Sequence, residues 1–112
     1  MSLVGSTTRV ASAAQTATGN SAAIVVSSLT IGLVLSVTAA AGTTPTLDVT
    51  LEWSADGVTF FSAQPADSFT QLIAVGGAVK SFTCKQAFYR IKWTITGSAG
   101  QSFTFSVSEM TF

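Results

Sequence analysis

The sequence contains no histidine and only one cysteine, Cys84, among its 112 residues. Histidine is the side chain that most often exchanges protons or binds metals near neutral pH, so its absence argues against an enzyme and against a zinc site. A single cysteine excludes an internal disulfide. Charge is also scarce, since five basic and five acidic residues cancel to a net charge of zero, unlike the basic surface of a nucleic-acid-binding protein. We therefore expect no catalysis, no cofactor, no metal and no nucleic-acid partner.

The chain also lacks a convincing membrane-spanning segment. No charged residue occurs between Arg9 and Asp48, and residues 22–42 are apolar overall. A spanning helix, however, needs about 20 mostly apolar residues in a row. Here the large side chains alternate with small or polar ones, and they are Leu29, Ile31, Leu33, Leu35 and Val37. This alternation predicts a strand with one buried face, and we expect no membrane partner.

The same period-two alternation recurs along the chain and predicts an all-β protein. Its clearest example runs from Leu47 to Trp53, and Asp56-Gly57 just beyond it is a hairpin signal. We predict strands over residues 29–39, 46–54, 58–62, 69–74, 79–84, 88–96 and 102–108. Turns are predicted at residues 40–45, 64–67, 76–77 and 97–100. About seven to eight short strands of this kind fit an antiparallel β-sandwich of jelly-roll or immunoglobulin-like type.

The N-terminal residues differ from the rest of the chain. Residues 1–23 are small and polar, with one weak strand signal around residues 9–17. We interpret them as an extended arm, either disordered or ordered by pairing, and residues 24–112 as the β-sandwich domain. Such an arm could add a strand to a neighbour's sheet. The residues predicted to contact a partner are Ser2, Leu3, Val4, Thr7, Arg9, Val10, Gln15 and Asn20.

Shared alternation also predicts the core. The side chains expected to be buried are Ile31, Leu33, Leu35, Leu47, Val49, Leu51, Trp53, Phe60, Ile91, Trp93, Phe103 and Phe105. Exposed tryptophans could instead stack on sugars, but Trp53 and Trp93 are in phase with aliphatic residues, which favours burial. Cys84 lies in an apolar run and is interpreted as an inert buried thiol.

The few charged residues suggest one cross-strand arrangement. Asp48 and Glu52 lie on the polar face of one predicted strand, and Arg90 and Lys92 lie on the polar face of another. If the two strands are neighbours, these residues form a ladder of ion pairs with a structural role.

Several segments together carry a family resemblance. They are residues 14–21, 37–49, 53–60, 88–95 and 102–107, including the turn sequence Trp53-Ser54-Ala55-Asp56-Gly57. The pattern resembles small β-sandwich virion proteins of tailed bacteriophages and prophages, of which capsid decoration (cement) proteins are a prominent class. Its motifs are strand and turn motifs, so they indicate the fold more than the function.

The resemblance implies a structural protein that is made in the bacterial host cytoplasm and stabilises the shell at the capsid surface. Its implied partners are the major capsid protein or other virion proteins, and the implied homo-oligomer is a trimer. A fold-level analogy is a weak guide to function, and two alternatives stay open. One is a tail or neck component, and the other is a carbohydrate- or receptor-binding β-sandwich module.

Overall fold

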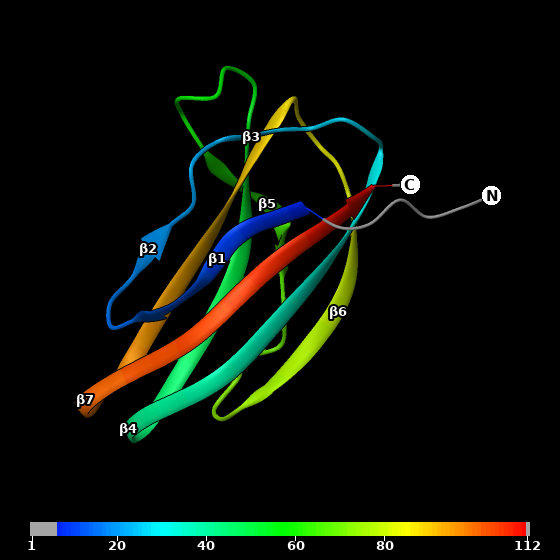
Figure 1. The fold of residues 1–112 in the computed structure, drawn as a ribbon. Helices are drawn as coiled ribbons and strands as arrows, with labels where there is room; N and C mark the ends of the chain where they lie inside the picture. The colour runs from blue at the N-terminus through cyan, green and yellow to red at the C-terminus, as the bar shows by residue number, and fades with distance from the viewer. Residues whose placement is uncertain (1–6, 112) are drawn as a thin grey trace.

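A computed structural model describes residues 7–111, and every regular element in this range is a strand (Figure 1). The strands are β1 (Thr7–Gln15), β2 (Gly19–Asn20), β3 (Ile24–Val25), β4 (Thr30–Ser54), β5 (Phe61–Ser68), β6 (Gly76–Thr83) and β7 (Phe88–Thr111). They form one antiparallel sheet of seven strands. The prediction of an all-β antiparallel protein is confirmed, whereas the sandwich stays a prediction. Within the described range there is no helix that could cross a membrane.

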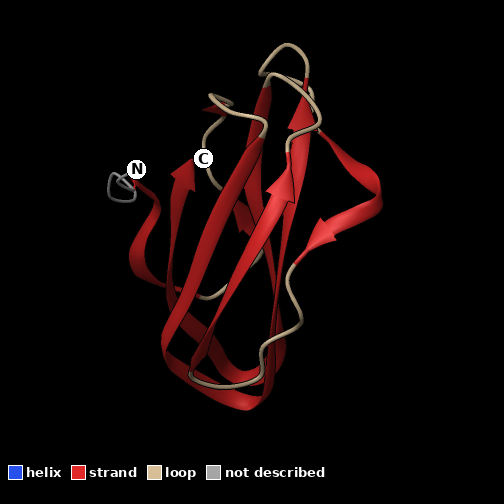
Figure 2. Cartoon of the chain, turned by 90° about the vertical axis from the view of Figure 1, so that its right-hand side faces the viewer, coloured by secondary structure: helices blue, strands red, loops and turns tan. Residues whose placement is uncertain are grey.

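The sheet is built around a ribbon of its two longest strands. β4 and β7 pair from Ile31 opposite Thr111 to Ser54 opposite Phe88. Each was predicted as two strands separated by a turn, but the predicted turns at 40–45 and 97–100 lie within the strands. At residues 40–45 of β4 and 97–100 of β7 the ribbon bends sharply, while the two strands stay side by side (Figures 1 and 2).

Glycine is required at this bend. Gly42 has a φ of 106°, and a Cβ atom there would lie 2.6 Å from the Cα of Gln101 on the facing strand. The pairing register also shifts between Ala41 and Thr43 and again before Thr46. The glycine signal in the sequence was therefore real, but it marks a bend in a paired ribbon instead of a loop.

The other strands flank the two halves of the ribbon. In the first half, residues 30–41 and 102–111, β6 pairs with β4 and β1 pairs with β7. In the second half, residues 46–54 and 88–96, β5 pairs with β4, while β2 and β3 pair with β7. Side chains of the two halves meet in one core, where the rings of Trp93 and Phe105 pack edge to face at 5.4 Å.

The predicted core is confirmed at every position but one. Eleven of the predicted side chains are buried, from Ile31 at 0% to Trp93 at 7% exposed. Phe60 is the exception and is only half-buried. The return strand begins at Phe61 instead of residue 58, so Phe60 lies in the connection, where its ring packs 4.6 Å from the Arg90 guanidinium.

Three other predicted boundaries were wrong. The predicted turn at residues 64–67 lies within β5, where residues 63–66 bulge between Ser62, opposite Glu52, and Asp67, opposite Leu51. The predicted strand at 69–74 is reduced to one bridge between Leu72 and Leu47. Apolar alternation was misleading there, because Ile73 is 67% exposed. β6 begins at Gly76 and includes the glycines predicted as a turn.

Trp93 provides a test of the packing between the two halves. Besides Phe105, the ring contacts Gly19, where a Cβ atom would lie only 2.9 Å from it. We expect Trp93→Ala to lower the free energy of unfolding by about 3–5 kcal/mol. The control Phe61→Ala removes a ring that is 70% exposed and should cost less than about 1 kcal/mol. Equal losses for the two variants in denaturant unfolding would contradict this packing.

Candidate functional site

The predicted contact residues fall partly on β1. Ser2, Leu3 and Val4 lie outside the described residues. Thr7, Arg9, Val10 and Gln15 belong to β1, which pairs with β7 of its own chain from Thr7 opposite Glu109 to Gln15 opposite Phe103. Asn20 lies in β2, opposite Lys92. Residues 7–15 are thus an edge strand of the sheet, whereas the division into an arm (1–23) and a domain (24–112) stays a prediction.

Two side chains hold β1 in place. Val10 is 7% exposed and belongs to the core, and the register shifts on both sides of it. The neighbouring Arg9 reaches Glu109, with 2.6 Å between Nε and Oε1. These two residues are therefore used within the chain, while Thr7 and Asn20 are exposed and could contact a partner.

Arg9 belongs to a buried polar cluster that sequence reasoning missed. The Glu109 side chain is only 1% exposed, and its Oε1 also accepts a 2.7 Å hydrogen bond from the Tyr89 hydroxyl. Burial, strengthened by the adjacent Glu109 carboxylate, raises the pKa of Tyr89 far above its ordinary value. Tyr89 is therefore protonated and acts as a donor. The cluster joins β1 to both halves of the ribbon.

The sequence did carry a signal for this cluster. Glu109 continues the period-two series of Phe103, Phe105 and Val107, all of them buried. An acidic residue in a buried phase needs a partner, and Arg9 is the one basic residue in the first half of the chain. Nearby, burial and then the charge of Glu109 raise the pKa of the half-buried Cys84 thiol, which fits the interpretation of an unreactive cysteine.

The predicted ladder of charges is confirmed in part. Glu52 lies directly opposite Arg90, and the Nε to Oε1 distance is 2.7 Å. Lys92 lies farther away, at 3.9 Å from Glu52. Asp48 does not join the ladder, because Thr94 lies opposite it and its carboxylate accepts from the Gln71 amide at 3.0 Å.

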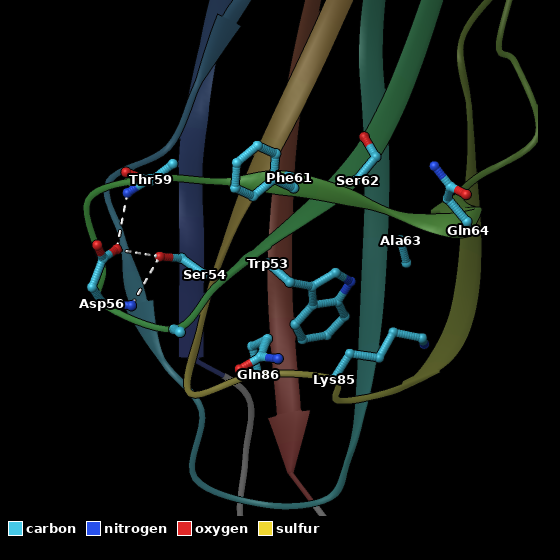
Figure 3. A pocket seen from close by; sticks show the side chains of 11 residues that line it. Trp53, Ser54, Asp56, Thr59, Phe61, Ser62, Ala63, Gln64, Lys85 and Gln86 are labelled. Atoms are coloured by element: carbon cyan, nitrogen blue, oxygen red, sulfur yellow. Dashed lines mark hydrogen bonds between the residues drawn. The ribbon is translucent and has the colours of Figure 1, made fainter.

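A cleft of about 480 Å³ opens beside the start of β5 (Figure 3). Trp53 lines it, and its Nε1 donates to Asp67 Oδ2 at 2.8 Å. Lys85 pairs with the same carboxylate at 3.0 Å and lies 5.5 Å from the indole ring. Phe61 forms an exposed wall, and the Gln64 and Gln86 side chains also line the cleft.

The acidic residue that lines this cleft, Asp56, uses its carboxylate for hydrogen bonds within a turn. Asp56 Oδ1 accepts from the Ser54 hydroxyl at 2.9 Å and from the Val58 and Thr59 amides at 2.9 and 3.0 Å. These hydrogen bonds lower the pKa of Asp56 from 3.8 to about 2. A carboxyl with so low a pKa is a poor general base at neutral pH. The cleft therefore offers contacts for binding.

Other kinds of site find little support in the described part of the chain. Trp53 and Trp93 are 4% and 7% exposed, as the core prediction required, so neither offers the open aromatic face that would favour sugar binding. Between residues 7 and 111, no group of three potential metal ligands comes together. No known protein family, curated protein or solved structure matches this chain.

The charged side chains share one property, which is that each has a partner within the chain. The acidic residues pair as Asp48 with Gln71, Glu52 with Arg90 and Lys92, Asp56 with Ser54, Asp67 with Trp53 and Lys85, and Glu109 with Arg9 and Tyr89. The remaining basic residue, Lys80, donates to the Ser68 carbonyl. The surface therefore presents strand edges, hydroxyls and apolar groups more than free charges.

The buried cluster can be tested through Arg9. Arg9→Met leaves the Glu109 carboxylate buried without its cation, and we expect a loss of about 2–4 kcal/mol in the free energy of unfolding. Adding Glu109→Gln removes the charge that lacks a partner, so the double variant should recover part of this loss. Chemical denaturation of the two single variants and the double variant measures the coupling. Strictly additive losses would contradict the described ion pair.

The turn at Asp56 predicts a pH dependence. Since folding lowers this pKa from 3.8 to about 2, the charged form stabilises the fold above about pH 4, and this contribution is lost as the pH falls through 2. Asp56→Asn keeps an acceptor but not the charge. We expect the variant to melt below the wild type at pH 7, and the difference to shrink toward pH 2. A difference in melting temperature that is independent of pH would refute the role of the charge.

Proposed function

We propose that this chain is a structural protein of a bacteriophage virion, without catalytic activity, that binds the capsid surface as a decoration protein. In this role it contacts the major capsid protein or other virion proteins and stabilises the shell. After synthesis in the host cytoplasm it would take its place on the outside of the particle. Support comes first from the resemblance of residues 14–21, 37–49, 53–60, 88–95 and 102–107 to small virion proteins.

The observation that carries the proposal is a net charge of zero combined with an internal partner for every charged side chain. The partner is an opposite charge for Glu52, Asp67 and Glu109, and a neutral group for Asp48, Asp56 and Lys80. Long-range steering by a charged surface is weak in such a molecule, and contacts must use backbone edges and apolar groups. Exposed apolar side chains are available on several elements, namely Val25, Leu29, Val34, Val58, Phe61, Ile73, Val75 and Val79. Scattered groups like these give each copy little affinity, which suits a component that acts in many copies.

The proposal includes the finer description of the fold as a β-sandwich formed by one folded sheet. Its support is the contact between the two halves of the ribbon, where Trp93 meets Phe105 and Tyr89 meets Glu109. A folded sheet with both inner faces apolar provides the layered core that a sandwich requires. The jelly-roll and immunoglobulin-like types of sandwich differ in strand order. The strand order to be compared with each type is β1-β7-β4-β5.

A homo-oligomer is part of the same proposal. The resemblance implies a trimer, whereas the open edge of β6 favours a dimer, and a measured mass decides between them. Of the alternatives, a tail or neck component would use the same surface, and its location in the particle distinguishes it. The sugar-binding alternative is less well supported, because the indole rings of Trp53 and Trp93 are buried.

Decoration can be tested with shells of the phage that encodes the chain, prepared without it. We expect the purified protein to co-sediment with these shells to saturation and to appear on their outer surface by electron microscopy. Because its net charge is zero, raising the salt concentration from about 0.05 to 0.5 M should weaken binding by less than about tenfold. Absence of binding, or labelling of the tail alone in intact virions, would overturn the capsid assignment.

A further inference from the structure

One edge of the sheet is long, regular and open. β6 pairs with β4 over all eight of its residues without a register shift, and it pairs with no other strand among residues 7–111 (Figure 1). The other described edges are interrupted or short. β1 has two register shifts, β5 contains Pro65 and a bulge, and β2 and β3 have two residues each. Interruptions of this kind protect natural edges from pairing, and β6 lacks them.

The hydrogen-bonding groups on this open edge follow from the register. Cys84 N donates to Leu29 O at 2.7 Å, just beyond the pair of Thr83 with Thr30. In an antiparallel ladder, residues alternate between pointing their N–H and C=O groups toward the neighbour and away from it. Even-numbered residues of β6 therefore bond to β4. The residues whose groups point away from β4 are Gly77, Val79, Ser81 and Thr83.

The side chains of β6 favour contact at its outer face. Val79 is 76% exposed and lies opposite Val34, which is 43% exposed, so the two form a small apolar patch. Lys80 is the one charged residue of β6. Inward-pointing charges can block an edge, but the ammonium of Lys80 lies over the Phe82 ring and donates to Ser68 of β5. Its charge is thus held away from the open edge.

We propose that a second copy of this chain pairs with β6 through its own β6, antiparallel and about a two-fold axis at Val79. This register places Val79 opposite Val79, Gly77 opposite Ser81 and Ala78 opposite Lys80 of the second copy. It forms about six backbone hydrogen bonds between the residues whose groups point outward. The register centred on Lys80 would instead place the two Lys80 residues at directly facing positions, and like charges on facing residues are unfavourable.

Self-complementarity is the reason for choosing a second copy over another occupant. A two-fold contact uses the same surface on both partners, and here Val79 meets Val79 while each Lys80 faces the small Ala78, so no like charges lie directly opposite each other. An unrelated extended peptide could also add to this edge, and a protein that remains monomeric by itself would favour that occupant. The inference concerns only the oligomeric state, for which it proposes a dimer in place of the trimer that the resemblance implies, and it does not depend on the capsid.

The test uses the purified full chain and measures its mass in solution by light scattering and analytical ultracentrifugation. We expect a dimer of about twice the 11.5 kDa chain mass. Val79→Lys and Val79→Glu should each raise the dissociation constant by about tenfold or more, because like charges meet at the axis. An equimolar mixture of the two variants should restore the dimer. The control Val58→Lys changes a valine that is 80% exposed on another element and should leave the dimer intact.

Several results would overturn the inference. They are a monomeric wild-type chain at every concentration tested, a trimer, or a dimer that Val79→Lys does not weaken. Circular dichroism and thermal melts show whether each variant is folded. If Val79→Lys unfolds the chain, Ser81→Pro replaces it as the test, because it removes an outward N–H without breaking a bond to β4, with Ser81→Ala as its control. A dimer that fails to bind shells would contradict the proposed function alone.

Discussion

The continuous pairing of β4 with β7 is the constraint on which the rest of the structure depends. The strands have 25 and 24 residues and remain paired through the bend at Gly42. Because both strands bend together, the two halves of the ribbon face each other, and every other strand is added to one half or the other. The bend thereby brings together side chains that are far apart along the ribbon, such as Trp93 and Phe105.

The scarce charges of the chain are arranged to support this core. Glu109 is the most deeply buried of the acidic side chains, and Arg9 compensates its charge from β1. Removing a charge from water is costly unless a partner is present, so the position of β1 depends on this pair as well as on Val10. A molecule that uses its charges in this way has few left for recognition, which connects the interior of the protein with the apolar and backbone contacts proposed for its surface.

The alternation of apolar and polar residues correctly predicted which side chains are buried in segments whose two ends both lie well inside the sheet. Leu47 to Trp53 and Phe103 to Val107 are buried in the expected phase, because a one-residue slip would expose each apolar set. Turn residues were a poorer guide. The segments at 40–45 and 97–100 contain glycine or proline and were interpreted as loops, although partners across the ribbon keep them in strands. Local composition indicates that the backbone bends at these segments, but it does not indicate whether the strand stays paired with its neighbour through the bend.

The contact residues could be predicted less well than the fold. Val10 and Arg9 were assigned to an extended arm, either disordered or ordered by pairing, because their neighbours are small. The partner of Arg9, Glu109, lies 100 residues away in sequence. Such long-range pairs leave no local pattern. The burial prediction failed at Phe60 for the opposite reason, because Val58 and Phe60 look locally like part of a strand but lie in the connection before β5, which begins at Phe61.

The distance in sequence between paired residues has a consequence for how the chain acquires its structure during synthesis. Thr7 pairs with Glu109, and Ile31 pairs with Thr111. While residues 102–111 are still inside the ribosome, the first half of β4 lacks its β7 partner and β1 has no strand to join. Non-local pairing of this kind slows folding and leaves apolar strands exposed to other nascent chains. The sheet can therefore be completed only after residues 102–111 of β7 have left the ribosome.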